Sequence, residues 1–176
     1  MSTVIETERL ILKDMALEDK QAYFDNITHD KEVLKYFVAS YNETIDELNI
    51  EPMIERSKKD DRCLLSVYLK ESGEFIGIIL QVSGPSALFP SSEIGYAYGR
   101  KYWGNGYASE ALIAFKDYLF EKGIHKLIVS HVVENEASKR VIEKAGFKYE
   151  GLHIDDLYYH DKYYNCCYYY LINPRG

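Results

Sequence analysis

The pattern of apolar and polar positions divides the chain into a helix-rich first part and a strand-rich remainder. A short alternating stretch, Thr7 to Leu12, predicts a first strand. Helical spacing then predicts helices at Leu17–Ile27, Lys31–Phe37 and Thr44–Lys59. Thr44 with Glu47 three residues later forms a capping-box pattern, so Thr44 is expected to begin the third of these helices.

From Arg62 onward the apolar positions recur with the period of β-strands, interrupted by two helical stretches. Strands are predicted at Arg62–Leu69, Phe75–Val82, Ser91–Tyr98, Lys126–His131, Phe147–Gly151 and Tyr163–Ile172. Helices are predicted at Gly106–Phe120 and Glu136–Ala145, and Gly146 is well placed as the residue that ends the second one.

This order of elements predicts a mixed α/β fold. Strand, helix and strand in succession form a right-handed unit with parallel strands, whereas the hairpins before it require antiparallel pairing. The expected architecture is one central, mixed and mostly antiparallel sheet with helices on both faces. We expect a single domain that covers residues 1–176.

The composition is that of a globular protein, with 47% hydrophobic and 28% charged residues. A formal net charge of −7 argues against nucleic acid as a partner and mildly favours a cationic substrate. No apolar run is long enough for a membrane span, and the first residues do not form a signal peptide, so we expect a cytoplasmic protein without a membrane partner. The cysteines Cys63, Cys166 and Cys167 suggest neither disulfides nor a metal site, and no metal is expected.

The segment Gly99–Ala111 contains the strongest chemical signal. It links a predicted strand to the N-terminus of the most strongly patterned helix, where free N–H groups and the helix dipole favour an anion. Glycines at 104 and 106 let the backbone approach a phosphate closely. A dinucleotide fingerprint would need Gly at the position of Ser109, and the Gly-Lys-Ser/Thr of a P-loop is absent.

Two motifs in the chain resemble signatures of the GNAT acetyltransferases. Trp103–Ala111 resembles their pyrophosphate-binding segment, Q/R-x-x-G-x-G/A, and Asn135–Phe147 resembles their second signature, N-x-x-S-x-R-V-x-E-K-x-G-F. Together with Thr7–Leu10 and Glu93–Tyr96, they are similar to the RimJ/RimL-like branch of that family, which includes acetyltransferases of ribosomal-protein N-termini.

This resemblance implies a site for acetyl-coenzyme A (acetyl-CoA). In the family, the strand before the glycine turn and the strand after the following helix splay apart, and the pantetheine arm pairs with backbone in between. The backbone contacts implied for the arm are those of Tyr96, Ala97 and Tyr98, and Asn135 would contact it from the other side. The pyrophosphate cradle would be formed by Gly104, Asn105, Gly106, Tyr107, Ala108 and Ser109.

The chain departs from the family pattern at two positions. Trp103 replaces the Gln or Arg of the general motif, so binding should rely on backbone, with Trp103 packed under the turn. Ile142 replaces a Tyr that in one branch protonates the leaving thiolate, so another group must serve as the acid.

Glu93 and Ser138 are the candidate catalytic residues. Glu93 lies beside the expected splay and is the candidate general base, although a solvated acid at a strand end is an alternative. Ser138 is the candidate acid, on the basis of its match to a Ser of the RimL-like branch, although it could simply make a helix-end hydrogen bond. A tyrosine among Tyr163–Tyr170 could replace it.

We therefore expect direct acetyl transfer from acetyl-CoA to a primary amine, without a covalent enzyme intermediate and without metal. The acceptor could be a protein N-terminus or a small amine such as an amino acid, polyamine or antibiotic. A non-catalytic acyl-CoA-binding module is the alternative class. The sequence leaves open whether the protein is a monomer or a dimer.

Overall fold

The computed structural model describes residues 3–86 and 88–175, and within them eight strands form one sheet. The strands are β1 (Val4–Glu6), β2 (Leu10–Asp14), β3 (Leu64–Leu69), β4 (Phe75–Ser83), β5 (Ser91–Tyr98), β6 (Lys126–Val132), β7 (Lys148–Tyr159) and β8 (Lys162–Ile172). Their order is β1-β2-β3-β4-β5-β6-β8-β7. Neighbours are antiparallel except β5 and β6, which are parallel, so the predicted mixed and mostly antiparallel sheet is confirmed.

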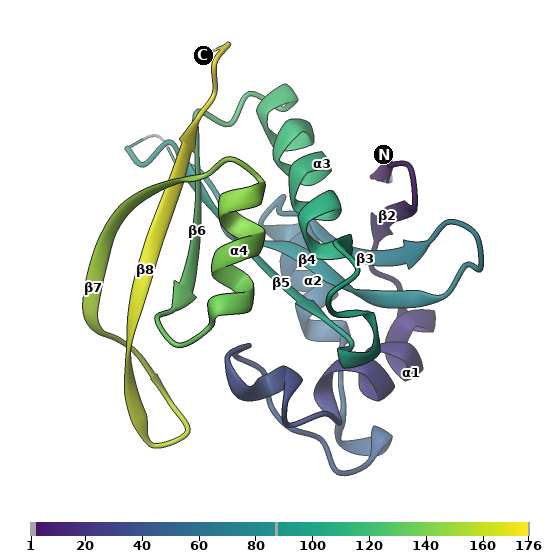
Figure 1. Ribbon diagram of the computed structural model, residues 1–176. Coiled ribbons are helices and arrows are strands. Elements are labelled where there is room, and N and C mark those ends of the chain that lie inside the picture. The colour runs from purple at the N-terminus through teal and green to yellow at the C-terminus, as the bar shows by residue number, and fades with distance from the viewer. Residues whose placement is uncertain (1–2, 87, 176) are drawn as a thin grey trace.

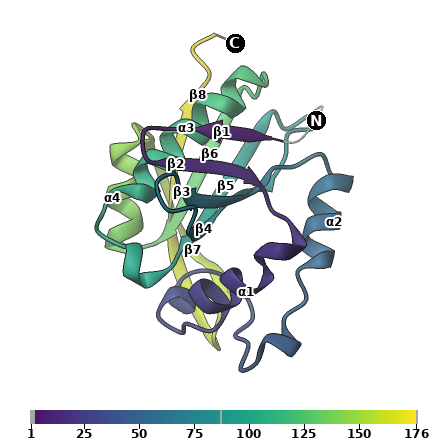
Figure 2. The same cartoon turned by 90° about the vertical axis from the view of Figure 1, so that its right-hand side faces the viewer.

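Helices cover both faces of the sheet, as the sequence predicts (Figures 1 and 2). The helices are α1 (Lys20–Tyr23), α2 (Glu51–Lys59), α3 (Tyr107–Glu121) and α4 (Glu136–Lys144). On the face of α3 and α4, Phe115 and Ile142 belong to one fully buried cluster with Ile94 of β5. On the other face, Ile27 and Ile54 pack in a second cluster with Ala97, also of β5. Alternate residues of β5 therefore face different cores, as the two-residue period of a strand requires.

The predicted first strand, Thr7–Leu12, is confirmed only over Leu10–Leu12, which begin β2; Thr7–Arg9 form the turn of a β1–β2 hairpin that was not predicted. The Thr7 hydroxyl accepts a hydrogen bond from the Leu10 N–H at 2.9 Å and donates one to Glu110 of α3 at 2.6 Å. The Arg9 N–H donates to the same Glu110 carboxylate at 2.9 Å. A partner about a hundred residues away thus satisfies the polar groups of this turn, and local periodicity carries no sign of it.

The predicted helix Thr44–Lys59 is also wrong, because it is broken into a single turn at Ile45–Glu47 and the later helix α2. Pro52 lies in the first turn of α2, where its missing N–H costs nothing. In a longer helix its ring would clash with the carbonyl of Leu48, which instead is extended and buried. The capping box is absent as well, since Glu47 accepts a hydrogen bond from the Glu43 N–H rather than from Thr44.

Two other segments differ from the prediction by more than two residues. The segment predicted as a helix at Lys31–Phe37 has only one helical turn, at Val33–Lys35. The strand predicted at Phe147–Gly151 extends to Tyr159, past a register shift between His153 and Leu157 that includes Asp155 at a φ of 50°. This bulge interrupts the alternation of side chains, so the pattern that predicts a strand stops before the second half of β7.

Candidate active site

Strands β5 and β6 pair for only part of their length. Their register runs from Ser91 with Lys126 to Ile94 with Val129 and then stops. Beyond that point, residues 95–98 pair only with β4 and residues 130–132 only with β8. We call this unpaired stretch of β5 and β6 the splay. The expected divergence of the two parallel strands is therefore confirmed.

Backbone groups of β5 in the splay lack a neighbouring strand on one side. The Gly99 N–H donates to the Ile76 carbonyl of β4 at 2.9 Å. Because successive residues of a strand direct their backbone groups to opposite sides, Ala97 also faces β4, where it pairs with Ile78. Tyr96 and Tyr98 then direct their backbone groups into the splay. Of the three residues implied for the pantetheine arm, Tyr96 therefore presents its N–H and carbonyl to the splay, and Tyr98 presents its N–H, because the Tyr98 carbonyl accepts a hydrogen bond from the Trp103 indole.

The β6 side of the splay has the same organisation. The Val133 N–H donates to the Asn165 carbonyl at 3.0 Å, which fixes the side of the chain that faces β8. By alternation, Ser130 and Val132 direct their backbone groups toward β5. The Val132 carbonyl accepts from the Asn135 N–H at 2.8 Å, whereas the Val132 amide points into the splay. The Ser130 amide lies next to Val129 in the last parallel pair and faces the Ile94 carbonyl. An extended ligand placed here would find strand-type partners on two sides.

The turn before α3 has the geometry of an anion cradle. Gly104 and Gly106 have φ values of 76° and 80°, in the left-handed region that favours glycine, and Gly106 is the N-cap of α3. The Asn105 amide holds the turn by donating to the carbonyls of Tyr102 and Trp103, each at 3.1 Å. The N–H groups of the first helical turn, those of Tyr107, Ala108 and Ser109, have no partner within the helix. The Ser109 side chain is buried, so that residue can offer a ligand only its N–H.

Trp103 is not packed under the turn as expected. Its side chain is 48% exposed, and its indole N–H donates to the Tyr98 carbonyl at 2.8 Å. An indole has one N–H donor and no acceptor. Trp103 therefore stabilises the end of β5 and has no further donor for a ligand.

The second signature, Asn135–Phe147, spans the whole of α4, which lies on the same face of the sheet as α3. Asn135 is the N-cap, and its side-chain oxygen accepts a hydrogen bond from the Ser138 N–H at 3.1 Å. Ile142 is fully buried and carries no proton to donate. The Ser138 hydroxyl lies 2.7 Å from the hydroxyl of Tyr96, whose pKa is raised by burial and lowered in part by this hydrogen bond. Tyr96 thus brings a second hydroxyl to Ser138.

Glu93 lies on the opposite face of the sheet, at the start of the splay. Its carboxylate accepts a hydrogen bond from the Ser130 hydroxyl at 3.1 Å. Burial raises the pKa of Glu93, the negative charge of Asp156 raises it further, and the bond from Ser130 opposes both. A raised pKa makes this carboxylate a stronger base than an exposed glutamate.

A polar row continues from Glu93 across β6, β8 and β7. Tyr168 lies directly opposite Ser130 in the β6–β8 register, and its hydroxyl donates to Asp156 at 2.8 Å. The ring of His153 stacks on Tyr168 with centroids 4.0 Å apart. Two carboxylates therefore accompany aromatic rings on this face, which favours a cationic amine.

Several of these residues were not singled out from the sequence. Ser130 is the one polar residue in the apolar centre of KLIVSH, which is a weak signal. Asp156 lies in a segment not predicted to be a strand. Tyr168 belonged to the tyrosine cluster, but its side of the sheet depends on the register. The side chain of Tyr96 was missed because only its backbone was considered.

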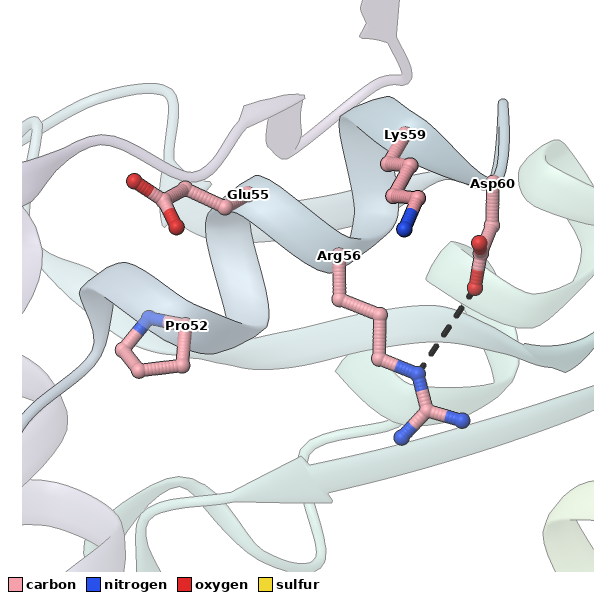
Figure 3. A pocket seen from close by; sticks show the side chains of 5 residues that line it. All are labelled: Pro52, Glu55, Arg56, Lys59 and Asp60. Carbon is pink, nitrogen blue, oxygen red and sulfur yellow. Dashed lines mark ion pairs between the residues drawn. The ribbon is translucent and has the colours of Figure 1, made fainter.

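Other features of the described residues do not overlap with this site. A surface hollow on α2, lined by Pro52, Glu55, Arg56, Lys59 and Asp60, shares no residue with it (Figure 3). Between residues 3 and 175, leaving out 87, no group of three metal-ligating side chains comes together. None of the helices in these ranges is long and apolar enough to cross a membrane.

The sequence profile described as "Acetyltransferase (GNAT) domain" matches residues 9–148. The chain belongs to the GNAT acetyltransferase family, whose members transfer acetyl from acetyl-CoA to amines. Among its relatives, "Uncharacterized N-acetyltransferase YoaA" of Bacillus subtilis is 29% identical over 183 residues and covers 99% of both chains. "Uncharacterized N-acetyltransferase YnaD" of the same organism is 31% identical over 150 residues and covers 84% of both.

Solved structures share the fold over nearly the whole chain. A GNAT-family acetyltransferase from Bacillus anthracis has a TM-score of 0.84 at 26% identity, covering 97% of this chain and 99% of that one. RimL, a ribosomal-protein alpha-N-protein acetyltransferase, has a TM-score of 0.84 at 18% identity, covering 98% and 95%. A spermidine N-acetyltransferase from Vibrio cholerae, solved with CoA and spermine, has a TM-score of 0.81 at 19% identity, covering 95% and 97%. At these last two identities the likeness shows the fold alone.

Proposed function

We propose that this acetyltransferase acts on a protein N-terminal α-amine, which reaches the splay from the Glu93 face. The observation that carries the proposal is the position of Glu93, a half-buried carboxylate at the edge of the splay, with a raised pKa and a second carboxylate, Asp156, nearby. The cofactor-binding elements, α3 and α4, lie on the other face. Donor and acceptor would then meet from opposite faces of one sheet.

Acetyl-CoA, when bound, supplies a thioester whose carbonyl carbon the amine attacks. The backbones of Tyr96 and Tyr98 would hold the pantetheine arm, with Asn135 on its other side. Gly104, Asn105 and Gly106 together with the first turn of α3 would hold the pyrophosphate. These assignments are supported by the free strand-edge groups of the splay and by the left-handed glycines of the turn.

In this proposal Glu93 accepts the proton of the acceptor ammonium, directly or through water. The neutral nitrogen forms the new C–N bond, the C–S bond breaks, and the nitrogen loses its second proton to solvent, which in turn replaces the proton that the leaving thiolate takes up. Ser138 stabilises the leaving thiolate by hydrogen bonding, with Tyr96 as the neighbouring hydroxyl that can supply the proton. No covalent enzyme intermediate is required.

The strength of the base distinguishes the two kinds of acceptor. An α-amine, with a pKa of about 7.7–8.0, is substantially neutral near pH 7.5, whereas an alkylamine with a pKa of about 10.4 is neutral only about one time in a thousand. A single carboxylate with a moderately raised pKa is better matched to the α-amine. A small amine remains the second candidate, because the acidic and aromatic row of Glu93, Asp156 and Tyr168 would also attract a polyamine.

A panel of acceptors tests the proposal. Acetyl-CoA is incubated with peptides bearing free or blocked N-termini, with an N-blocked lysine peptide, and with amino acids, polyamines and aminoglycosides, while free thiol is measured. We expect thiol release with free N-termini and little with the blocked and lysine-only peptides. Thiol release with a small amine alone would contradict the proposal and would show that the acceptor is a small amine.

A further inference from the structure

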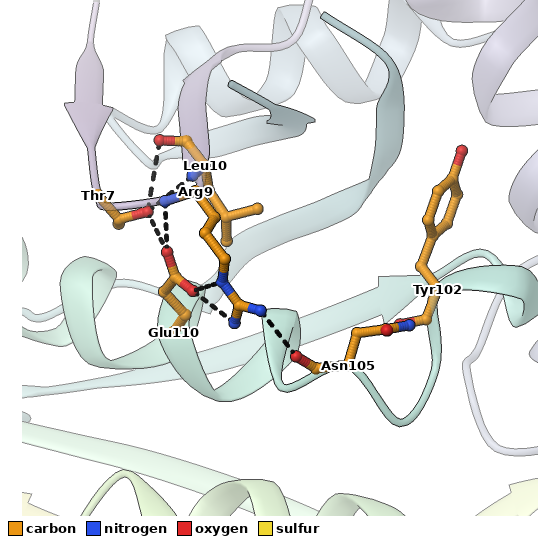
Figure 4. A network of polar contacts seen from close by, with 6 residues as sticks. All are labelled: Thr7, Arg9, Leu10, Tyr102, Asn105 and Glu110. Atoms are coloured by element: carbon orange, nitrogen blue, oxygen red, sulfur yellow. Dashed lines mark hydrogen bonds and ion pairs between the residues drawn. The ribbon is translucent and has the colours of Figure 1, made fainter. Parts of the chain in front are cut away.

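The guanidinium of Arg9 reaches the phosphate-binding turn from the distant β1–β2 hairpin. Its Nε and Nη2 atoms each lie 2.7 Å from Oε2 of Glu110, and Nη1 donates to the Asn105 carbonyl at 3.1 Å (Figure 4). The group also lies over the ring of Tyr107, with 4.6 Å between Cζ and the ring centroid. Four contacts thus fix its position beside the N-terminus of α3.

These contacts leave part of the guanidinium unused. An arginine side chain has five N–H groups, and three of them are engaged, by the hydrogen bonds from Nε to Glu110 and from Nη1 to Asn105 and by the ion pair of Nη2 with Glu110. Within residues 3–86 and 88–175, the remaining N–H groups on Nη1 and Nη2 have no acceptor. The side chain is 43% exposed, so these donors are open to a ligand.

The open donors lie at the candidate phosphate site itself. A Cβ atom built on Gly106 would lie 3.5 Å from Nη2 of Arg9 and 3.9 Å from Nζ of Lys144. Two cations, one from the β1–β2 turn and one from α4, therefore lie near the N-cap of α3. The chain has a formal net charge of −7, so this is a locally positive region on a protein that is negative overall.

We propose that Arg9 is a pyrophosphate-binding residue of the acetyl-CoA site. Its free Nη1 and Nη2 donors would bind the phosphate oxygens that the backbone of Gly106 and the first turn of α3 cradle. Glu110 and Asn105 hold the guanidinium in position, and Lys144 adds a second, less constrained positive charge. The inference rests on the proposed cofactor site. Arg9 would supply the full positive charge that the turn lacks, because the one donor of Trp103 is already bonded to the Tyr98 carbonyl.

Charge explains why such a residue matters. Backbone N–H groups and the helix dipole supply only partial charges, whereas an arginine makes charge-assisted hydrogen bonds that are about twice as strong as neutral ones. Planar, two-pronged donation suits phosphate better than the point charge of a lysine.

The experiment compares Arg9→Met and Arg9→Lys with the wild-type protein against three ligands. Calorimetry gives the affinity for CoA and for 3′-dephospho-CoA, and kinetics give kcat/KM for acetyl-pantetheine, which has no phosphate. We expect Arg9→Met to weaken CoA and dephospho-CoA alike, by roughly 10-fold or more, and to leave the acetyl-pantetheine rate unchanged. Arg9→Lys should recover part of the loss.

Two controls separate a direct contact from a structural role. Arg56→Met removes the same charge from the exposed surface of α2 and should leave all three ligands unaffected. Glu110→Gln breaks the ion pair but keeps the Arg9 cation, so CoA affinity should stay within about threefold of wild type.

Three outcomes would overturn the inference. Unchanged CoA affinity in a folded Arg9→Met would show that Arg9 does not contact the cofactor. A loss confined to CoA would assign Arg9 to the 3′-phosphate, and an equal loss with acetyl-pantetheine would show a general structural effect. A wild-type protein that binds no CoA would refute the proposed cofactor site itself, which is a distinguishable result.

Discussion

At the scale of single residues, Glu93 leads to an activity that depends on pH. Glu93→Gln removes the proposed base while its amide oxygen can still accept from Ser130, so kcat/KM should fall by roughly 10²-fold near neutral pH. The loss should shrink as pH rises, because solvent then supplies the neutral amine. Steady-state rates from pH 6 to 9 test this, with Glu55→Gln on α2 as the matched control. Wild-type rates of Glu93→Gln across that range would show that Glu93 is not the base.

The raised pKa of Glu93 also makes the stability of the fold depend on pH, and this contribution to stability falls as pH rises. A folded-state pKa above the unfolded one means that the contribution of Glu93 to the free energy of unfolding is full below its ordinary pKa and is lost as pH rises through the folded pKa. Glu93→Gln should therefore have a higher Tm than wild type at pH 7. The difference should vanish in acid, where both side chains are neutral.

Ser138 and Tyr96 share one hydrogen bond, and their variants divide the acid role between them. Ser138→Ala should lower kcat modestly with little change in CoA affinity, since the loss of a main oxyanion contact typically costs about 10²–10³ and Tyr96 remains. Tyr96→Phe should lower kcat as well, and the double variant should lose more than either. Tyr170→Phe tests the tyrosine cluster, the alternative source of the acid. Full kcat in Ser138→Ala with a collapse in one of the Phe variants would assign the acid to that tyrosine.

At the scale of elements, the turn and α3 form the part of the site that local sequence predicts best. Gly106→Glu places a carboxylate among the phosphate donors and next to Arg9 and Lys144, so CoA binding should be lost. The left-handed φ at Gly106 also makes any side chain costly, by roughly 1–2 kcal/mol. Gly123→Glu carries the same charge and a similar strain, at a φ of 87° after the C-terminus of α3, and should bind CoA normally. Unchanged CoA affinity in a folded Gly106→Glu would contradict the cradle.

The elements that sequence patterns predicted correctly are those with complete local signals. Helices α3 and α4 combine an apolar stripe with a glycine boundary, and Gly146 has the left-handed φ expected of a residue that ends a helix. The failures have physical causes that the apolar periodicity does not contain. Pro52 and the burial of Leu48 override the periodicity of Thr44–Lys59, and Glu110 supplies a distant acceptor to the Thr7–Arg9 turn in addition to its local hydrogen bonds.

At the scale of the whole molecule, the sheet brings together residues that the sequence separates. Glu93, Ser130, Tyr168 and Asp156 come from four strands, and only the strand order β5-β6-β8-β7 makes them one row. The position of Glu93 on its predicted strand was enough to make it a candidate base. Its partners depend on the strand register and on the bulge in β7, which the sequence does not reveal. The Tyr159 hydroxyl also contacts the carbonyls of Phe37 and Ala39, joining the β7–β8 hairpin to the N-terminal part (Figure 1). Such long-range pairings have no counterpart in local periodicity.

The splay is the central claim at this scale, and amide hydrogen exchange with and without CoA tests it most directly. CoA should slow exchange at Tyr96 and Tyr98 of β5 and at Val132 of β6, because these amides face the splay and lack a strand partner there. The Ala97 amide, which already faces β4, is the internal control and should change little. Slower exchange at these three positions would support the proposed cofactor site. Unchanged exchange at the splay, with CoA slowing amides elsewhere on the protein, would contradict it.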